Sequence, residues 1–371
     1  MPPVRRAAAP LALCVLAAGC AAAPAPDTAD RAVRTAVAAW SRQPSARPPG
    51  LPLAQWTYEV TGVRREGARA TATAELRYRI DGYDTAPAGS ARDIRLSLSG
   101  GRWTVTGDAP APGAPPQPWD QGPLDVVRGA RALVLRAGRG GPDPADVAAD
   151  ADRAVPAVAA AWPRPWAGRV VVLVPPTQEA MAALLGRPAA AYTGMAAVTT
   201  GSTGGAPAPA DRIVLNPAAY AQLSAAGRNV VLTHEATHAA TRPATTDRTP
   251  LWLSEGLADW AAYRGTGTAP ADAAPALARA VRRGELPAGL PSDRDFAFGT
   301  DADSLARAYE GAWLACRLIA DRWGDGILIR LYERAGREPL DTVLREELGL
   351  DGAALARAWR ERLRTELAAA P

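Results

Sequence analysis

The chain has few residues of the types that cross-link proteins or bind transition metals. Its 371 residues include three cysteines and two histidines, and every basic side chain is an arginine because lysine is absent. Since Cys14 and Cys20 fall in the N-terminal segment, only Cys316 remains for the rest of the chain, which excludes an intramolecular disulfide there. Stability must therefore come from apolar cores.

The charge of the chain is modest and evenly spread. The formal net charge is +4, and no block of clustered arginines with interleaved aromatic residues occurs. We therefore expect no nucleic-acid partner. Beyond the N-terminal segment, no apolar run is long enough for a membrane-spanning helix. The alanine-, proline- and arginine-rich composition is typical of a GC-rich genome, such as that of an actinomycete.

The N-terminal segment has the features of an export signal. Arg5 and Arg6 precede an apolar run over residues 7–18, which is too short for a permanent membrane helix. Residues 16–20 (LAAGC) resemble the lipobox of bacterial lipoproteins, in which Cys20 receives the lipid. The resemblance implies export and a membrane anchor through Cys20 at the outer face of the cytoplasmic membrane. The alternative is an ordinary cleaved signal and a secreted protein.

Both histidines lie in one pentapeptide, residues 234–238 (HEATH). Residues four apart lie on the same face of a helix, so His234 and His238 can reach one metal ion. Glu235 is offset from His234 by about 100° around the helix, so it is not placed as a ligand but can reach a water molecule at the metal. This is the position of a general base. The alternative is a solvent-exposed helical pair of histidines that binds no metal.

Two imidazoles leave a catalytic zinc site one protein ligand short. No third histidine exists, so the candidates are carboxylates and Cys316. In residues 250–260 (PLWLSEGLADW), Ser254 can cap a helix that carries Glu255 and Asp259 on one face. We predict Glu255 as the third ligand, with Asp259 accepting a hydrogen bond from a ligand histidine. The alternative is that both acids are polar residues of a surface helix. Zinc is inferred from the ligand types.

These segments resemble the gluzincin metallopeptidases, and among them the bacterial peptidase MA-like families. The resemblance rests on HEATH at 234–238 and WLSEGLADW at 252–260, where Glu255 matches the downstream zinc glutamate and Asp259 the aspartate beside the ligand histidine. Residues 308–312 (AYEGA) resemble the tyrosine segment of aminopeptidase N relatives. The resemblance implies that Tyr309 stabilises the tetrahedral intermediate. The alternative is a tyrosine packed in the core.

The expected activity is zinc-dependent peptide-bond hydrolysis at the cell envelope. Aminopeptidase N relatives carry an acidic residue in a Gly-x-Met-Glu-Asn strand, whereas residues 194–198 (GMAAV) have none. This departure disfavours an aminopeptidase and favours an endopeptidase acting on a peptide or protein substrate. A catalytically silent metal-binding lipoprotein that recognises an envelope partner is the main alternative, and hydrolysis of a non-peptide amide is a third possibility.

Composition shifts divide the chain into a small and a large domain. Residues 68–80 alternate between apolar and polar, which predicts a strand, and Val33, Val37 and Trp40 mark a preceding amphipathic helix. We predict an α+β fold: a helix-plus-antiparallel-sheet domain, similar to NTF2-like or cystatin-like domains, followed by a gluzincin-like domain with a mixed sheet and a helical C-terminal subdomain. The expected bounds are a signal peptide at 1–20, a tether at 21–27, the accessory domain at 28–108, a proline-rich linker at 109–118 and the zinc metallopeptidase domain at 119–371.

The large domain is expected to begin with strands and to end in helices. Helices are predicted beyond Trp260, most clearly at 304–323 and 352–369. In related enzymes an edge strand beside the active-site helix binds an extended substrate backbone. The resemblance therefore implies such a role for the strand at 195–200 or the strand at 212–215, and which of the two is left open. The strands are predicted at 124–135, 169–174, 195–200 and 212–215.

Overall fold

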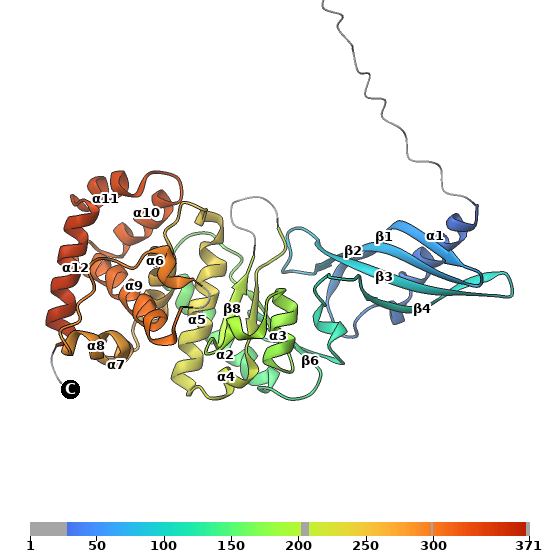
Figure 1. The fold of residues 1–371 in the computed structure, drawn as a ribbon, viewed down its shortest axis with the longest axis horizontal. Coiled ribbons are helices and arrows are strands. Elements are labelled where there is room, and N and C mark those ends of the chain that lie inside the picture. Colours follow the sequence, from blue (N-terminus) through green and yellow to red (C-terminus); the bar gives the residue numbers. More distant parts are fainter. Residues whose placement is uncertain (1–27, 202–207, 298–299, 369–371) are drawn as a thin grey trace, which may run out of the picture.

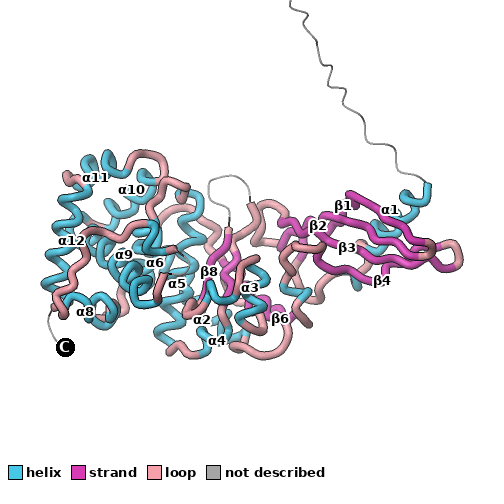
Figure 2. Tube along the Cα trace, viewed as in Figure 1, coloured by secondary structure: helices cyan, strands magenta, loops and turns pink. Residues whose placement is uncertain are grey.

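The computed structural model describes residues 28–201, 208–297 and 300–368. These residues form three regions in a row: a helix with an antiparallel sheet, then a mixed sheet, then a group of helices (Figure 1). Figure 2 shows the strands confined to the first two regions. The predicted α+β class is confirmed. Cys20 and the N-terminal segment lie outside the described residues, and the domain bounds stay a prediction.

The N-terminal region is one helix packed on an antiparallel meander. It comprises α1 (Thr28–Trp40), β1 (Leu53–Glu66), β2 (Arg69–Ile80), β3 (Ala88–Ser99) and β4 (Arg102–Pro110), with the strands paired in sequence order. Side chains along β2 alternate between buried and less buried positions, as predicted, because successive residues of a strand point to opposite faces. The buried face packs against Val33 and Val37 of α1. The finer likeness to NTF2-like or cystatin-like domains stays a prediction.

The middle region is a five-stranded mixed sheet. Its strands are β5 (Leu124–Arg128), β6 (Ala132–Ala137), β7 (Val170–Val174), β8 (Ala197–Thr200) and β9 (Arg212–Leu215), in the order β5-β6-β7-β9-β8. β6, β7 and β9 run parallel, whereas β5 and β8 are antiparallel to their neighbours. All five residues of β7 are buried, as expected for a central strand covered on both faces. β8 is an edge strand, because it is last in this order and pairs with β9 alone within the described sheet.

The two faces of the mixed sheet are covered by different parts of the chain. One face packs against α2 (Pro144–Ala161) and α5 (Ala225–Thr241), which share one apolar cluster with Val134, Val172 and Ile213. The other face packs against α3 (Gln178–Leu185) and the end of the N-terminal sheet. The side chains that the N-terminal sheet contributes to this second cluster are Trp56, Leu76, Tyr78 and Ile80.

A polar contact reinforces this junction between the two sheets. Asp84, in the connection between β2 and β3, accepts hydrogen bonds from Nη2 of Arg212 at 2.9 and 3.0 Å. Arg212 is the first residue of β9. The Asp84 side chain is fully buried, so its charge requires this partner. The N-terminal region is thus held to the mixed sheet by both apolar and charged contacts.

The third region is a group of helices around α9. The two long helices predicted from the sequence are present with similar bounds. The elements are η4 (Arg242–Ala244), α6 (Leu251–Tyr263), α7 (Pro270–Ala273), α8 (Pro275–Arg282), η5 (Asp293–Phe296), α9 (Ala302–Trp323), α10 (Asp325–Ala335), α11 (Leu340–Leu348) and α12 (Gly352–Leu367). Two further short elements belong to the middle region: η3 (Ala189–Tyr192) precedes β8, and α4 (Pro217–Ala221) follows β9.

α6 begins earlier than the sequence predicted. We expected Ser254 to cap this helix, but α6 begins at Leu251, and Ser254 is buried inside the helix. The physical reason is a distant acceptor: the backbone N–H of Leu251 donates to Asp293 at 2.9 Å, so no local serine cap is needed. Gly256 lets α6 approach α9 closely, since an added Cβ would lie 2.3 Å from the carbonyl oxygen of Ala312.

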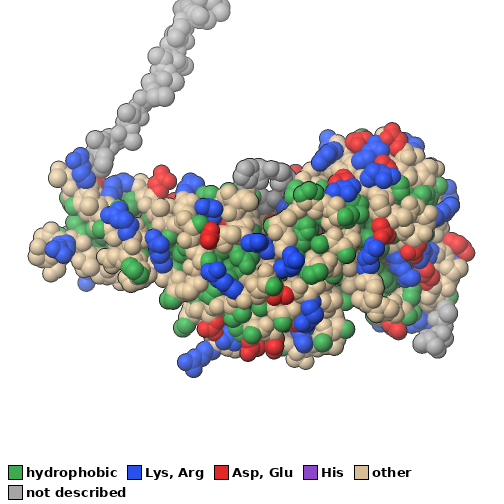
Figure 3. Space-filling model, turned by 180° about the vertical axis from the view of Figure 1, so that it is seen from behind, with side chains coloured by type: hydrophobic (Ala, Val, Ile, Leu, Met, Phe, Trp, Pro, Cys, Tyr) green, Lys and Arg blue, Asp and Glu red, His purple; other side chains and the backbone are tan. Residues whose placement is uncertain are grey.

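The surface shows no concentration of one charge on the face drawn in Figure 3. Arginine side chains are scattered over that face, with acidic side chains among them. Of the helices in the described part of the chain, none combines the length and the apolar character needed to cross a membrane.

Candidate metal centre

Two adjacent helices carry the predicted metal ligands. Ser224 caps α5, its hydroxyl accepting a hydrogen bond from the N–H of Gly227 at 3.1 Å. α5 then continues through the HEATH segment, and the spacing of four places both imidazoles on one side of the helix. α6 packs against α5 and carries Glu255 and Asp259 one turn apart.

Three side chains converge on a single point. Nε2 of His234 lies 3.1 Å from Nε2 of His238, and both nitrogens lie 3.3 Å from Oε2 of Glu255. Donor atoms that bind one zinc ion tetrahedrally, at the usual distance of about 2.0–2.1 Å, lie about 3.3 Å from one another. The three residues thus fit a zinc site with one side open, and they are the group in the described chain whose donor atoms could hold a metal.

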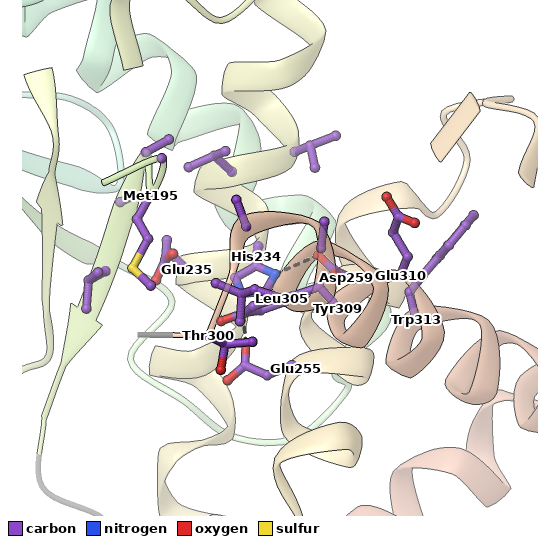
Figure 4. A pocket seen from close by; sticks show the side chains of 18 of the residues that line it. Met195, His234, Glu235, Glu255, Asp259, Thr300, Leu305, Tyr309, Glu310 and Trp313 are labelled. Atoms are coloured by element: carbon purple, nitrogen blue, oxygen red, sulfur yellow. Dashed lines mark hydrogen bonds and ion pairs between the residues drawn. The ribbon is translucent and has the colours of Figure 1, made fainter. Parts of the chain in front are cut away.

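Asp259 fixes the orientation of one of the two imidazoles. Its Oδ1 lies 2.8 Å from Nδ1 of His234, so Nδ1–H donates to the carboxylate and Nε2 faces Glu255 and His238. Figure 4 shows Asp259 on the side of the His234 ring away from Glu235. The structure therefore brings Asp259 to the place where a carboxylate selects the tautomer of a ligand histidine.

The pKa values of the site reflect attraction between its imidazoles and its carboxylates. Burial opposes a charge on His234, but the nearby carboxylates, Asp259 first, outweigh burial and raise its pKa well above the ordinary value. Burial also acts to raise the pKa of Glu255, but His238 and His234 outweigh it and hold that pKa far below the ordinary range. The imidazoles and carboxylates of the cluster thus stabilise one another's charges.

Glu235 points from α5 toward the edge strand β8. Its side chain is buried, with 7% of the residue exposed, and its Oε2 accepts a hydrogen bond from the hydroxyl of Thr199 at 2.6 Å. In Figure 4 the carboxylate lies on the Met195 side of His234. Thr199 was not predicted, because no local feature of the sequence shows that a strand residue contacts a helix residue 36 positions away.

A cleft of about 870 Å³ lies over these side chains. Its walls come from β8 and the segment before it, from α5 and α6, and from α7 to α9. Glu310 and Trp313 lie farther along the cleft than Tyr309 (Figure 4). Although the chain has 42 basic residues, none is among the described residues that line the cleft. The charged groups in its walls, other than the two imidazoles, are carboxylates.

Tyr309 lines the cleft beside the candidate ligands. Its ring lies 6.3 Å from the ring of His234 and 5.3 Å from that of Phe296, measured between centroids. The charge of Glu255, followed by burial, raises the pKa of the phenol well above its ordinary value, so the hydroxyl keeps its proton. Within the described chain, no hydrogen bond occupies this hydroxyl. The phenol is thus available as a donor within the cleft.

Cys316, the remaining ligand candidate from the sequence, lies outside the cluster. It is fully buried between helices, with its Sγ 3.9 Å from the carbonyl oxygen of Leu253. Burial raises the pKa of its thiol well above the ordinary value, which disfavours the thiolate that a metal would need. Glu255 occupies the third position instead.

Comparison with known proteins finds similar solved structures at low identity. An M1 zinc metallopeptidase from Deinococcus radiodurans aligns with 85% of this chain and 75% of its own, at 16% identity and a TM-score of 0.36. Two structures of one mutant form of an M1 zinc metallopeptidase from that organism, the second bound to a Tyr-Ser-Ala substrate, also align, both with a TM-score of 0.37. These alignments cover 71% and 85% of this chain, at 18% and 14% identity, and 58% and 61% of the length of the two neighbours. No model of a protein family matches the chain, and no curated protein matches it.

Proposed function

We propose that the chain is a zinc-dependent metallopeptidase in which Glu235 acts as general base. The observation that carries this proposal is the convergence of His234, His238 and Glu255 on one point, beside a buried carboxylate that faces the same cleft. These three donors match the set of three protein ligands that catalytic zinc sites use together with an open position.

The residues around the site have complementary tasks in hydrolysis. A zinc ion held here would supply Lewis acidity, which polarises a substrate carbonyl and makes a water molecule acidic near neutral pH. Glu235 takes the proton of the attacking water and passes it to the leaving amine. Tyr309 donates its phenolic hydrogen to the oxyanion that forms on the carbonyl. Asp259 holds His234 in the required tautomer.

The edge strand β8 offers a place for an extended peptide. Within the sheet β8 pairs with β9 on one side, and Ala197, Val198 and Thr199 line the cleft. A substrate backbone added along β8 would extend the sheet by one strand and place its carbonyls near the candidate metal site. Of the two strands left open by the sequence, β8 is therefore the one we propose, since β9 lies between β7 and β8.

The described lining of the cleft offers few groups that could hold an end of a peptide chain. It has no basic side chain for a terminal carboxylate, and the segment at 194–198 has no carboxylate for a free amino terminus. The carboxylates in the described lining belong instead to α5, α6, α7 and α9. Glu310, farther along the cleft, already accepts hydrogen bonds from the backbone N–H groups of Ala276 and Leu277. These features support endopeptidase activity over trimming of chain ends.

We further propose that the enzyme acts at the cell envelope as a lipoprotein anchored through Cys20. The support is the sequence of the N-terminal segment, with two arginines, a short apolar run and LAAGC ending at Cys20. The test is fractionation of cells that express the full chain or its Cys20→Ala variant. The wild-type protein should be recovered with membranes and the variant should not; equal recovery of both would contradict the anchor and favour the secreted alternative.

The experiment that tests the enzymatic proposal is metal analysis combined with a peptide digest. Zinc is measured in the soluble chain from Ala21 onward and in its Glu255→Ala variant, purified identically, and the wild type is then incubated with a peptide library. We expect near-stoichiometric zinc that is lost in the variant, and cleavage that a chelator abolishes. Zinc without cleavage would favour the silent metal-binding lipoprotein. Absence of zinc would overturn both the metallopeptidase and the silent metal-binding alternative.

A further inference from the structure

We propose that Thr199 is a positioning residue for Glu235, whose carboxylate it orients toward the reacting water. This inference rests on the proposed function, because the role of Glu235 as general base is part of it. The observation behind it is a hydrogen bond of 2.6 Å between the Thr199 hydroxyl and Oε2 of Glu235, in the wall of the cleft.

Thr199 is itself held rigidly. It lies in β8 and is paired with Ile213 of β9, with the adjacent pairs on either side also formed. Ala197, two residues earlier and on the same side of the strand, is buried in the cluster that contains α5, so this side of β8 faces the helix. Because threonine is β-branched, its χ1 rotamer is restricted. The hydroxyl is therefore a fixed point from which the carboxylate can be oriented.

The hydroxyl contacts Glu235 at two atoms. Besides Oε2, it lies 3.0 Å from the main-chain carbonyl oxygen of the same residue. A hydroxyl has one proton to donate and can accept as well. The shorter distance, to Oε2, marks the carboxylate as the acceptor of this proton. The main-chain carbonyl oxygen is a second acceptor nearby. The hydroxyl therefore lies between the side chain and the main chain of the residue that it positions.

No other side chain could easily replace this contact. In the described part of the chain, no arginine pairs with Glu235, and Thr199 is the side chain that hydrogen-bonds its carboxylate. Hydrogen bonds to charged groups contribute about 1.5–3 kcal/mol. Without the hydroxyl, Oε2 would lose its partner in a site that is only 7% exposed, and the carboxylate would rotate more freely.

The first measurement is steady-state turnover of the mature chain on a peptide that it cleaves. Thr199→Val, which keeps the shape but removes the hydroxyl, should lower kcat about 10- to 100-fold, with KM and zinc content little changed. Thr199→Ser should restore most of kcat. The matched control is Thr106→Val, which removes a strand hydroxyl that donates to a main-chain carbonyl, that of Arg95, far from the cleft, and should leave kcat unchanged.

The second measurement is a double-mutant cycle on stability, which needs no turnover. Thr199→Val, Glu235→Ala and the double variant are unfolded in urea, and the two sites should be coupled by about a tenfold change in the unfolding equilibrium constant. Additive effects would overturn the contact itself. If the two sites are coupled in stability but Thr199→Val keeps wild-type kcat, the positioning role is overturned. It is also overturned if Thr199→Ser is as slow as Thr199→Val. A zinc-loaded wild type that cleaves no peptide would overturn the proposed function and the positioning role with it, whereas the coupling would still report on the contact.

Discussion

Two parts of the molecule contain clusters of buried charged groups. The two clusters differ in whether an arginine pairs with the carboxylates. In the N-terminal region, Arg92 is 1% exposed and donates to Asp108 at 2.8 Å and to both oxygens of Asp120 at 2.6 and 2.8 Å. Asp120 lies in the short helix η2 (Pro118–Asp120), just after β4. Each strong donor of this network therefore faces an acceptor, and the network brings its own cation.

The cluster on α5 and α6 contains no arginine. Nε2 of His234, Nε2 of His238 and Oε2 of Glu255 all point at one place, and no arginine of the described chain lines the cleft around them. Since Asp259 accepts a hydrogen bond from Nδ1–H of His234, Nε2 is the nitrogen that can bind a metal. The two regions thus differ in that the first network contains its own cation, whereas under the proposed function the donor atoms of the second are arranged to hold one from solution.

The largest expected effect separates metal binding from catalysis. Glu235→Gln should lower turnover by about two to four orders of magnitude, because an amide cannot take a proton from water. Its zinc content should match that of the wild type, since Glu235 hydrogen-bonds Thr199 and is not one of the three converging side chains. Steady-state kinetics and elemental analysis on the same preparations test this. A variant that binds zinc and keeps wild-type turnover would remove Glu235 from the mechanism.

The next effect should be seen in stability alone. Arg92→Met leaves Asp108 and Asp120 without their cation, so the free energy of unfolding should fall by about 3–5 kcal/mol while zinc affinity is unchanged. Urea unfolding and a zinc titration measure the two quantities. The matched control is Arg95→Met, an exposed arginine of β3, which should cost less than about 0.5 kcal/mol. Equal losses of unfolding free energy in both variants would show that the Arg92 network contributes no more to stability than an exposed arginine does.

A smaller effect is expected from Asp259, the residue that orients His234 in the metal centre. Asp259→Asn should weaken zinc binding about 10- to 100-fold, since the carboxylate that holds the Nδ1 proton of His234 is lost. Competition with a chromophoric chelator gives the affinity. Asp272→Asn serves as control, because Asp272 lines the same cleft but is exposed and makes no contact with either histidine. Unchanged affinity in Asp259→Asn would assign Asp259 to packing alone.

The parts of the site that a single helix determines could be predicted from the sequence. The placement of His234, Glu235 and His238 follows from 3.6 residues per turn, and that of Glu255 and Asp259 from the same rule on α6. The alternation along β2 was equally local. The spacing within each helix needed no knowledge of how distant segments meet. The approach of Glu255 to the two histidines depends on the packing of α6 against α5, and Glu255 was predicted from the lack of a third histidine and from the resemblance to gluzincin metallopeptidases.

Contacts between distant segments that no sequence motif marks could not be predicted. β1 was not predicted, because its burial alternates less regularly than that of β2. The start of α6 was misplaced because its first N–H is satisfied by Asp293, 42 residues later. Thr199 was missed for the same reason, since nothing near it in the sequence refers to α5. The core shared by the two sheets likewise appears only when both are folded.

The smallest expected effect concerns the charge of the substrate. Because the described lining of the cleft carries Asp259, Asp272 and Glu310 but no basic side chain, a glutamate beside the scissile bond meets mainly negative charge. Like charges about 9 Å apart, at an effective dielectric constant of about 40, repel by about 1 kcal/mol, so kcat/KM should fall about fivefold relative to the same peptide with glutamine. Raising the ionic strength should narrow this ratio, because mobile ions screen the exposed part of the cleft. Faster cleavage of the glutamate peptide would mean that an arginine from outside the described lining reaches the bound substrate, and the contrast between a network that contains its own arginine and a cleft lined by none would no longer hold.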